Sequence, residues 1–231
     1  MSDESMSTLR PLDASTQRAH GAVLSDSSRK VLRNTYALLG MTLAFSAAVA
    51  GTAMALKLPA PGLIITLIGF FGLMFWVNKT AHKAQGLLAV FAFTGFLGYT
   101  LGPTLSAVLA MPHGSAIVTQ ALGTTALAFL GLSAVALTTK RDFSFMGNFL
   151  MIGSLVAFAL SLGAIFFSIP ALSLAVCAMV VMLMSGFILF DTSRMVHGGV
   201  DNYIVATVGL YMNIFNLFIS LLSILGIMSN D

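Results

Sequence analysis

Seven long apolar runs, separated by short polar connections, dominate the hydropathy pattern of the chain. A helix of roughly 20 residues, rising about 1.5 Å per residue, crosses a hydrocarbon core of about 30 Å. Most of the runs reach that length, and the second is the shortest. They cover approximately residues 35–56, 62–77, 85–109, 116–137, 145–167, 170–189 and 203–227. The pattern predicts an all-α membrane protein, with a bundle of seven transmembrane helices within residues 30–231.

Composition supports a membrane protein and excludes an ordinary soluble domain. Of the 231 residues, 58% are hydrophobic and only 8% are charged, which is far too apolar for a soluble domain of this size. The single cysteine, Cys177, lies inside an apolar run, so the chain has no internal disulfide. We expect that thiol to be buried and inert.

Residues 1–29 differ from the rest of the chain. They are rich in Ser, Thr, Asp and Arg, and they contain neither the apolar core nor the cleavage site of a signal peptide. The composition predicts a disordered tail. Ten of the eleven Lys and Arg residues fall in segments that alternation of the spans places on one side, with Lys57 opposite. The positive-inside rule therefore predicts a cytoplasmic N-terminus and a C-terminus outside.

Asp191 is the acidic residue that directly adjoins an apolar run of membrane length. A carboxylate deep in a bilayer costs about 2.5–3.5 kcal/mol on insertion scales, so it needs a partner, water or a proton. Arg194 lies three positions on, on the same helical face, and we expect it to reach back toward Asp191. The chain then breaks at residues 197–199, where two glycines suit a helix end, and re-enters the membrane at Tyr203 as a helical hairpin.

The returning helix has a stripe of small and polar residues spaced by four, three, four and three positions, within about 80° of arc. Its members are Gly209, Asn213, Asn216, Ser220 and Ser223. One interpretation is a hydrogen-bonding seam between neighbouring helices. The other is a polar cavity for proton or cation sensing, with Asp191, Arg194, Asn213 and Asn216 as its candidate residues.

The third and fourth runs contain residues suited to helix packing. Gly98 and Gly102 form a GxxxG face with Gly95 one turn earlier, which would let another helix approach closely. The fourth run has three polar residues for which we expect hydrogen bonds between helices. These are Gln120, Thr124 and Thr125.

Motifs of hydrolases, nucleotide-binding loops and metalloenzymes are missing from the sequence, and the four histidines are scattered. We therefore expect no enzyme activity, no catalytic residue, no metal site and no cofactor. We also expect no nucleic-acid partner; the bilayer is the expected surrounding.

Five segments together resemble the Bax inhibitor family of seven-helix membrane proteins over about residues 30–226. Within that family they are most similar to bacterial inner-membrane members that modulate the FtsH protease. The segments are KVLRNTYALLGMTLAFSA, AFTGFLGYTLGP, LTTKRDFSFMG, ILFDTSRMVHGG and DNYIVATVGLYMNIFNLFISLLSILG.

The resemblance implies two alternative functions. Calcium-leak members of the family have facing aspartates on the sixth and seventh helices and an arginine in the second. Asp191 occupies the first aspartate position, but Asn213 occupies the second, and the run at 62–77 has no charge. An asparagine cannot hold the proton that two coupled carboxylates share. This departure argues against the interpretation of the protein as a pH-responsive calcium or proton leak.

The other implied function is regulation of the membrane-anchored FtsH protease through protein contact. Such an unfoldase needs an unstructured handle, and an extended tail of about 30 residues reaches about 100 Å at ~3.3 Å per residue. A tail of this kind, followed by a bundle that resists extraction, suits a slowly degraded competitive substrate in the bacterial inner membrane.

Overall fold

Seven long helices form the described part of the chain, and all seven are long and apolar enough to cross a membrane. The computed structural model describes residues 26–139, 141–167 and 169–229. A short 3₁₀ turn, η1 (Ser144–Met146), precedes the fifth long helix. The long helices are α2 (Asp26–Ala55), α3 (Leu63–Thr80), α4 (Gln85–Leu109), α5 (Gly114–Thr138), α6 (Gly147–Phe167), α7 (Pro170–Val196) and α8 (Tyr203–Met228). The expectation of an all-α protein with seven candidate spans is confirmed for these residues.

Several helices are longer than the apolar runs that predicted them. Helix α2 begins at Asp26, so residues 26–29 of the predicted tail form its first turn, while residues 1–25 lie outside the described residues. Helix α3 continues to Thr80 and α7 to Val196. Polar residues extend a helix beyond the hydrocarbon without penalty, and an acidic residue in the first turn suits the helix dipole. Hydropathy therefore marked the membrane-embedded part of each helix rather than its ends.

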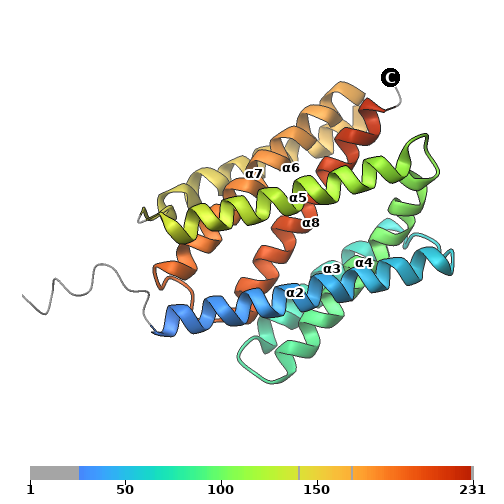
Figure 1. The fold of residues 1–231 in the computed structure, drawn as a ribbon. Helices are drawn as coiled ribbons and strands as arrows, with labels where there is room; N and C mark the ends of the chain where they lie inside the picture. The colour runs from blue at the N-terminus through green and yellow to red at the C-terminus, as the bar shows by residue number, and fades with distance from the viewer. Residues whose placement is uncertain (1–25, 140, 168, 230–231) are drawn as a thin grey trace, which may run out of the picture.

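Helix α8 is the centre of the bundle. Helices α2, α3 and α4 form one group and α5, α6 and α7 another, with α8 crossing between them (Figure 1). Helix α8 packs against α2, α4, α5 and α7, whereas α3 packs mainly on α4 and α6 mainly on α7. The two groups are therefore joined chiefly through α8.

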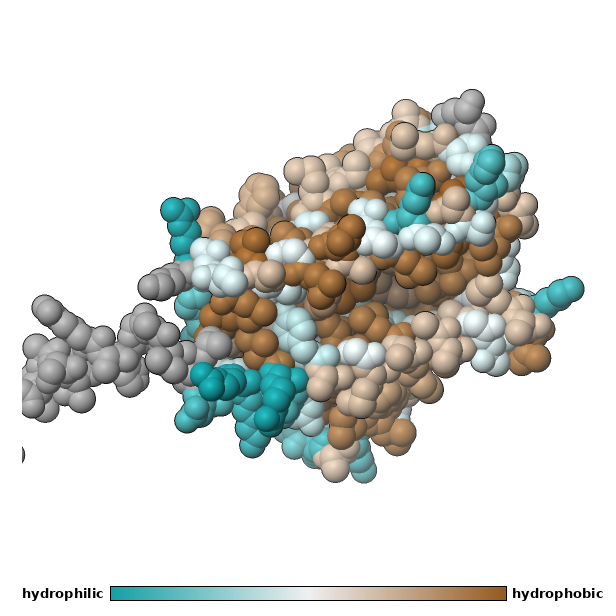
Figure 2. Space-filling view, in the orientation of Figure 1, coloured by the Kyte–Doolittle hydropathy of each residue, from teal (hydrophilic) through white to brown (hydrophobic). Residues whose placement is uncertain are grey.

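The two outer helices, α3 and α6, present large apolar side chains away from the bundle. Phe71 and Phe75 of α3 and Phe149 and Phe158 of α6 are all more than half exposed. The face seen in Figure 2, on which α2 and α5 lie in front, is also rich in hydrophobic side chains along the helices. Such a surface is stable only against lipid chains, in agreement with the seven candidate spans.

Close packing of α4 on α2 depends on three of the glycines of α4, Gly95, Gly98 and Gly102. A Cβ atom at Gly98 would collide with the carbonyl oxygen of Ser46, and one at Gly102 would lie 2.7 Å from the Cβ of Ala53. At Gly95 it would lie 2.8 Å from the ring of Phe45. The glycine face thus lies against α2 and lets the two backbones approach.

The polar residues of α5 do not form the hydrogen bonds between helices that we expected. The hydroxyl of Thr125 donates to the Ala121 carbonyl of its own helix at 2.7 Å. The side chains of Gln120 and Thr124 are exposed. A threonine hydroxyl reaches the carbonyl four residues back, so no second helix is needed to satisfy it.

Candidate functional site

The turn between α7 and α8 ends one helix and starts the next within six residues. Gly198 has a φ of 77°, in the left-handed region that favours glycine. The backbone N–H of Gly199 donates to the carbonyl of Arg194 at 2.8 Å. These features form a Schellman-type helix end. The predicted hairpin and its glycine break are therefore present in the structure.

Asn202 starts α8 and fastens it to the end of α3. Its side-chain oxygen accepts hydrogen bonds from the backbone N–H groups of Ile204 at 2.8 Å and Val205 at 3.3 Å. Its side-chain amide donates to the carbonyl of Ala81 at 2.8 Å and also lies 3.3 Å from Nδ1 of His82. Asn202 was not among the predicted site residues. An asparagine directly before an apolar helix was the available signal of an N-cap.

Asp191 and Asn213 meet between α7 and α8. The side-chain amide of Asn213 donates to Oδ2 of Asp191 at 2.8 Å. Asn213 is only 7% exposed. A Cβ atom at Gly209, one turn before Asn213, would lie 3.5 Å from the same carboxylate oxygen. That distance is an ordinary van der Waals contact, so Asp191 lies against the stripe on α8 and receives its hydrogen bond there from Asn213.

Two other candidate residues lie differently from our expectation. Arg194 turns toward the loop: its Nη2 donates to the carbonyl of Gly199 at 3.0 Å, and its guanidinium lies 5.4 Å from the ring centre of Phe190. Asn216 donates to the Met212 carbonyl of its own helix at 2.9 Å. The interhelical hydrogen bond of Asp191 therefore comes from Asn213 and not from Arg194 or Asn216.

Asp191 nevertheless opens onto a polar cavity of about 400 Å³ at the loop end of α7 and α8. Acidic and basic side chains and one imidazole line the cavity together. Its polar lining includes Asp191, Arg194, His82, Asp201 and Asn202. Such a cavity can hold water or a small cation beside the carboxylate.

The segment before α6 is anchored to α7 close to this cavity. The backbone N–H of Phe143 donates to the hydroxyl of the fully buried Ser193 at 3.0 Å. Asp142 accepts from the backbone N–H of Ser144 at 2.8 Å, and hydrogen bonds from Ser144 hold the pKa of Asp142 below its ordinary value. The polar connection before α6 is thus tied to the same end of α7 as Asp191.

The profile of the family described as "Inhibitor of apoptosis-promoting Bax1" matches residues 28–230, nearly the whole described part of the chain. The chain belongs to this Bax1 inhibitor family. The matched residues cover α2 from its third residue and all of the other six long helices, and they include Asp191 and Asn213.

Among relatives within the family, the modulator of FtsH protease YccA of Escherichia coli K12 is 50% identical over 95% of this chain and 100% of its own length. An inner membrane protein of Escherichia coli O6:H1 has the same identity and coverage. A membrane protein of Vibrio cholerae is 47% identical over 88% of this chain and 92% of its own. With its seven candidate spans, this member of the family is a multi-pass inner-membrane protein.

Proposed function

We propose that this protein binds the membrane-anchored, ATP-dependent FtsH protease and modulates it as a competitive inhibitor. The observation that carries the proposal is the 50% identity, over 95% of the chain, to the Escherichia coli modulator of FtsH protease. Identity at this level extends over the complete length of that relative. The action is contact with the protease and not catalysis, and it requires no cofactor.

The proposed orientation places the N-terminus in the cytoplasm and the C-terminus outside. In that orientation the end of α3 with the connection at 81–84, and the connections at 139–146 and 197–202, all lie on the cytoplasmic side, where basic residues are enriched. Reporter fusions at residues 142 and 231 test it: the first is expected inside and the second outside. Both reporters on one side would contradict it.

The polar N-terminal segment is the proposed handle for the protease. In this mechanism the protease engages residues 1–25 but extracts the seven-helix bundle slowly, so occupied protease degrades other clients more slowly. The buried core supports resistance to extraction, because α8 packs against four other helices and each helix must leave the bilayer in turn.

Proteoliposomes containing purified FtsH, a model client and the full chain test the mechanism. The full chain is expected to slow degradation of the client, and deletion of residues 2–25 is expected to remove most of that effect. The matched control replaces the same residues with a shuffled sequence of equal composition, which keeps the length of the handle and should keep the inhibition. Failure of FtsH to bind the full chain in a pull-down would refute the proposal.

The second candidate function is a pH-responsive cation leak, which the polar cavity at Asp191 favours. Two features of the site weigh against it. Asp191 faces the neutral Asn213 and not a second carboxylate, and the basic residue of α3, Lys79, lies in its last turn. Calcium flux into liposomes containing the parent or an Asp191→Asn variant tests this candidate. If the cavity conducts ions, the parent protein must give calcium flux, and the Asp191→Asn variant must change that flux.

A further inference from the structure

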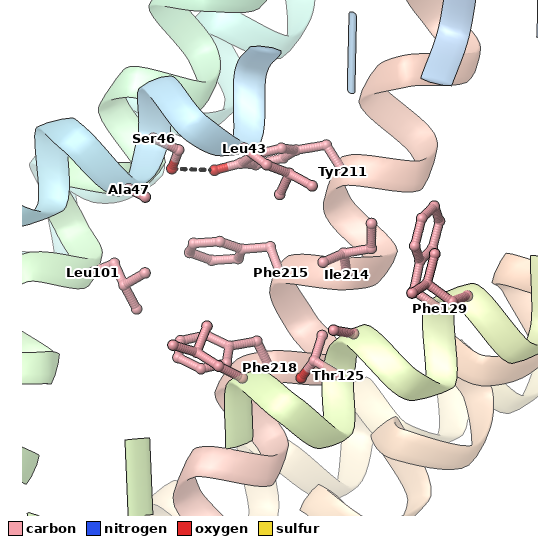
Figure 3. A pocket seen from close by; sticks show the side chains of 13 residues that line it. Leu43, Ser46, Ala47, Leu101, Thr125, Phe129, Tyr211, Ile214, Phe215 and Phe218 are labelled. Atoms are coloured by element: carbon pink, nitrogen blue, oxygen red, sulfur yellow. Dashed lines mark hydrogen bonds between the residues drawn. The ribbon is translucent and has the colours of Figure 1, made fainter. Parts of the chain in front are cut away.

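A lateral groove separates the two helix groups on the face where α2 and α5 form opposite walls. Its volume is about 380 Å³. Phe215 of α8 projects into it from the floor, between Ala47 of α2 and Phe129 of α5 (Figure 3). Leu101 of α4 and Phe218 of α8 also line it. The groove therefore belongs to no single pair of helices, and it is distinct from the polar cavity at Asp191.

The polar atoms along the groove already have hydrogen-bond partners. The hydroxyls of Ser46 and Tyr211 bond to each other at 2.6 Å, as Figure 3 shows. The hydroxyl of Thr125 donates to the carbonyl of Ala121. A polar ligand would find no unpaired side-chain donor or acceptor in the groove and would lose its own hydrogen bonds on entering. An apolar ligand has no hydrogen bonds to lose. The chemistry of the lining selects an apolar occupant.

The groove lies halfway through the membrane-spanning part of the bundle. Phe215 stands 12 residues after the first residue of α8, Tyr203, and 13 before its last, Met228. At about 1.5 Å per residue, both ends of the helix are roughly 18 Å away along its axis. Lipid chains, and not headgroups or water, occupy this depth of a bilayer. A lipid acyl chain whose headgroup lies at the membrane interface, about 15 Å from the midplane, is long enough to reach the groove.

We infer that the groove between α2 and α5 binds an acyl chain of a bilayer phospholipid. The chain enters sideways from the membrane and lies on Phe215, between Ala47 and Phe129. The apolar lining atoms lack contacts on the open side of the groove, and an acyl chain lying there supplies them. The bound chain contacts both helix groups and so helps to set the distance between them.

A phospholipid with a photoreactive diazirine at the end of one acyl chain tests the inference. The full chain is reconstituted in vesicles of phosphatidylethanolamine and phosphatidylglycerol that contain a small fraction of this probe. After illumination, mass spectrometry locates the adducts. We expect labelling of Phe215 on the groove floor as well as of Phe158, which is 65% exposed on the outer face of α6 and reports ordinary contact with surrounding lipid.

Two adjacent substitutions separate binding in the groove from general lipid contact. Ala47→Phe places a ring in the groove and is expected to lower labelling of Phe215 about tenfold while leaving Phe158 labelled. Ala48→Phe, on the exposed side of α2 and outside the lining, should leave both adducts unchanged. Absence of floor adducts in the parent, or full floor labelling in Ala47→Phe, would overturn the inference. Floor labelling by a photoreactive free fatty acid but not by the phospholipid probe would also overturn it.

Discussion

Asn213 of α8 donates its side-chain amide to the carboxylate of Asp191 on α7, at 2.8 Å, in the membrane-spanning part of the bundle. A carboxylate at that position needs a donor, and a neutral amide supplies one without adding a second charge. The contact therefore acts as a fixed link between the two helices of the hairpin. A pair of carboxylates at the same distance would instead repel when both were ionised.

Removing either member of this pair should destabilise the bundle. Asp191→Leu leaves the amide of Asn213 without its partner, and Asn213→Leu leaves the carboxylate without its donor; each should cost about 1–3 kcal/mol. The double variant should cost less than the sum of the two, with a coupling on the order of 1 kcal/mol. Titration with SDS, followed by circular dichroism, measures the free energy of unfolding.

Asn216→Leu is the matched control for the pair, because Asn216 bonds to the backbone of its own helix. Combining Asn216→Leu with Asp191→Leu should give additive losses of unfolding free energy. Coupling as large as that between Asp191 and Asn213 would show that Asn216 also supports the carboxylate.

Gly98→Ala should weaken the packing of α4 on α2. The new methyl group would collide with the carbonyl oxygen of Ser46, and the backbone cannot move aside as a flexible side chain could. We expect a loss of about 1–3 kcal/mol in the unfolding free energy. Gly51→Ala, which has no neighbour within 4 Å, is the control and should be neutral or stabilising by up to about 1 kcal/mol. Equal losses in both variants would contradict the packing role.

Gly198→Ala should strain the turn of the hairpin. Gly198 has a φ of 77°, where a Cβ atom costs about 1–2 kcal/mol. The neighbouring Gly199→Ala places its methyl group no closer than 3.5 Å to the nearest atoms, those of Arg194, and should change stability by less than about 0.5 kcal/mol. Melting temperatures in detergent distinguish the two, and a larger decrease for Gly199→Ala would refute this account of the turn.

Asn202→Ala should loosen the start of α8 and its link to α3. The substitution removes the acceptor for the Ile204 N–H and the donor to the Ala81 carbonyl. The expected loss is about 0.5–2 kcal/mol. Hydrogen exchange should rise at residues 204 and 205 in particular. Asn78→Ala is the control, since Asn78 is exposed and bonds to the carbonyl of Met74 in its own helix; increased exchange at 204 and 205 in that variant would argue against the cap.

Hydropathy and local chemistry were sufficient to predict the seven spans, the hairpin after Asp191 and the glycine-dependent end of α7. Each of these features follows from interactions between residues close in sequence or between a segment and the bilayer. The stripe on α8 was also readable, because helical periodicity fixes which residues share a face. The proposed contact with the protease remains a prediction.

The partners of those faces depended on how the helices pack. Spacing placed Arg194 near Asp191, but a carbonyl of the following loop competes for its guanidinium, and Asn213 arrives from α8. The central position of α8 and the groove between α2 and α5 likewise have no local signature, because the lining comes from four helices far apart in the chain. The sequence determined which polar, small and apolar residues lie on each face of a helix. The tertiary structure determined which other helix contacts that face, because the rotation and crossing of packed helices are set by all their contacts together.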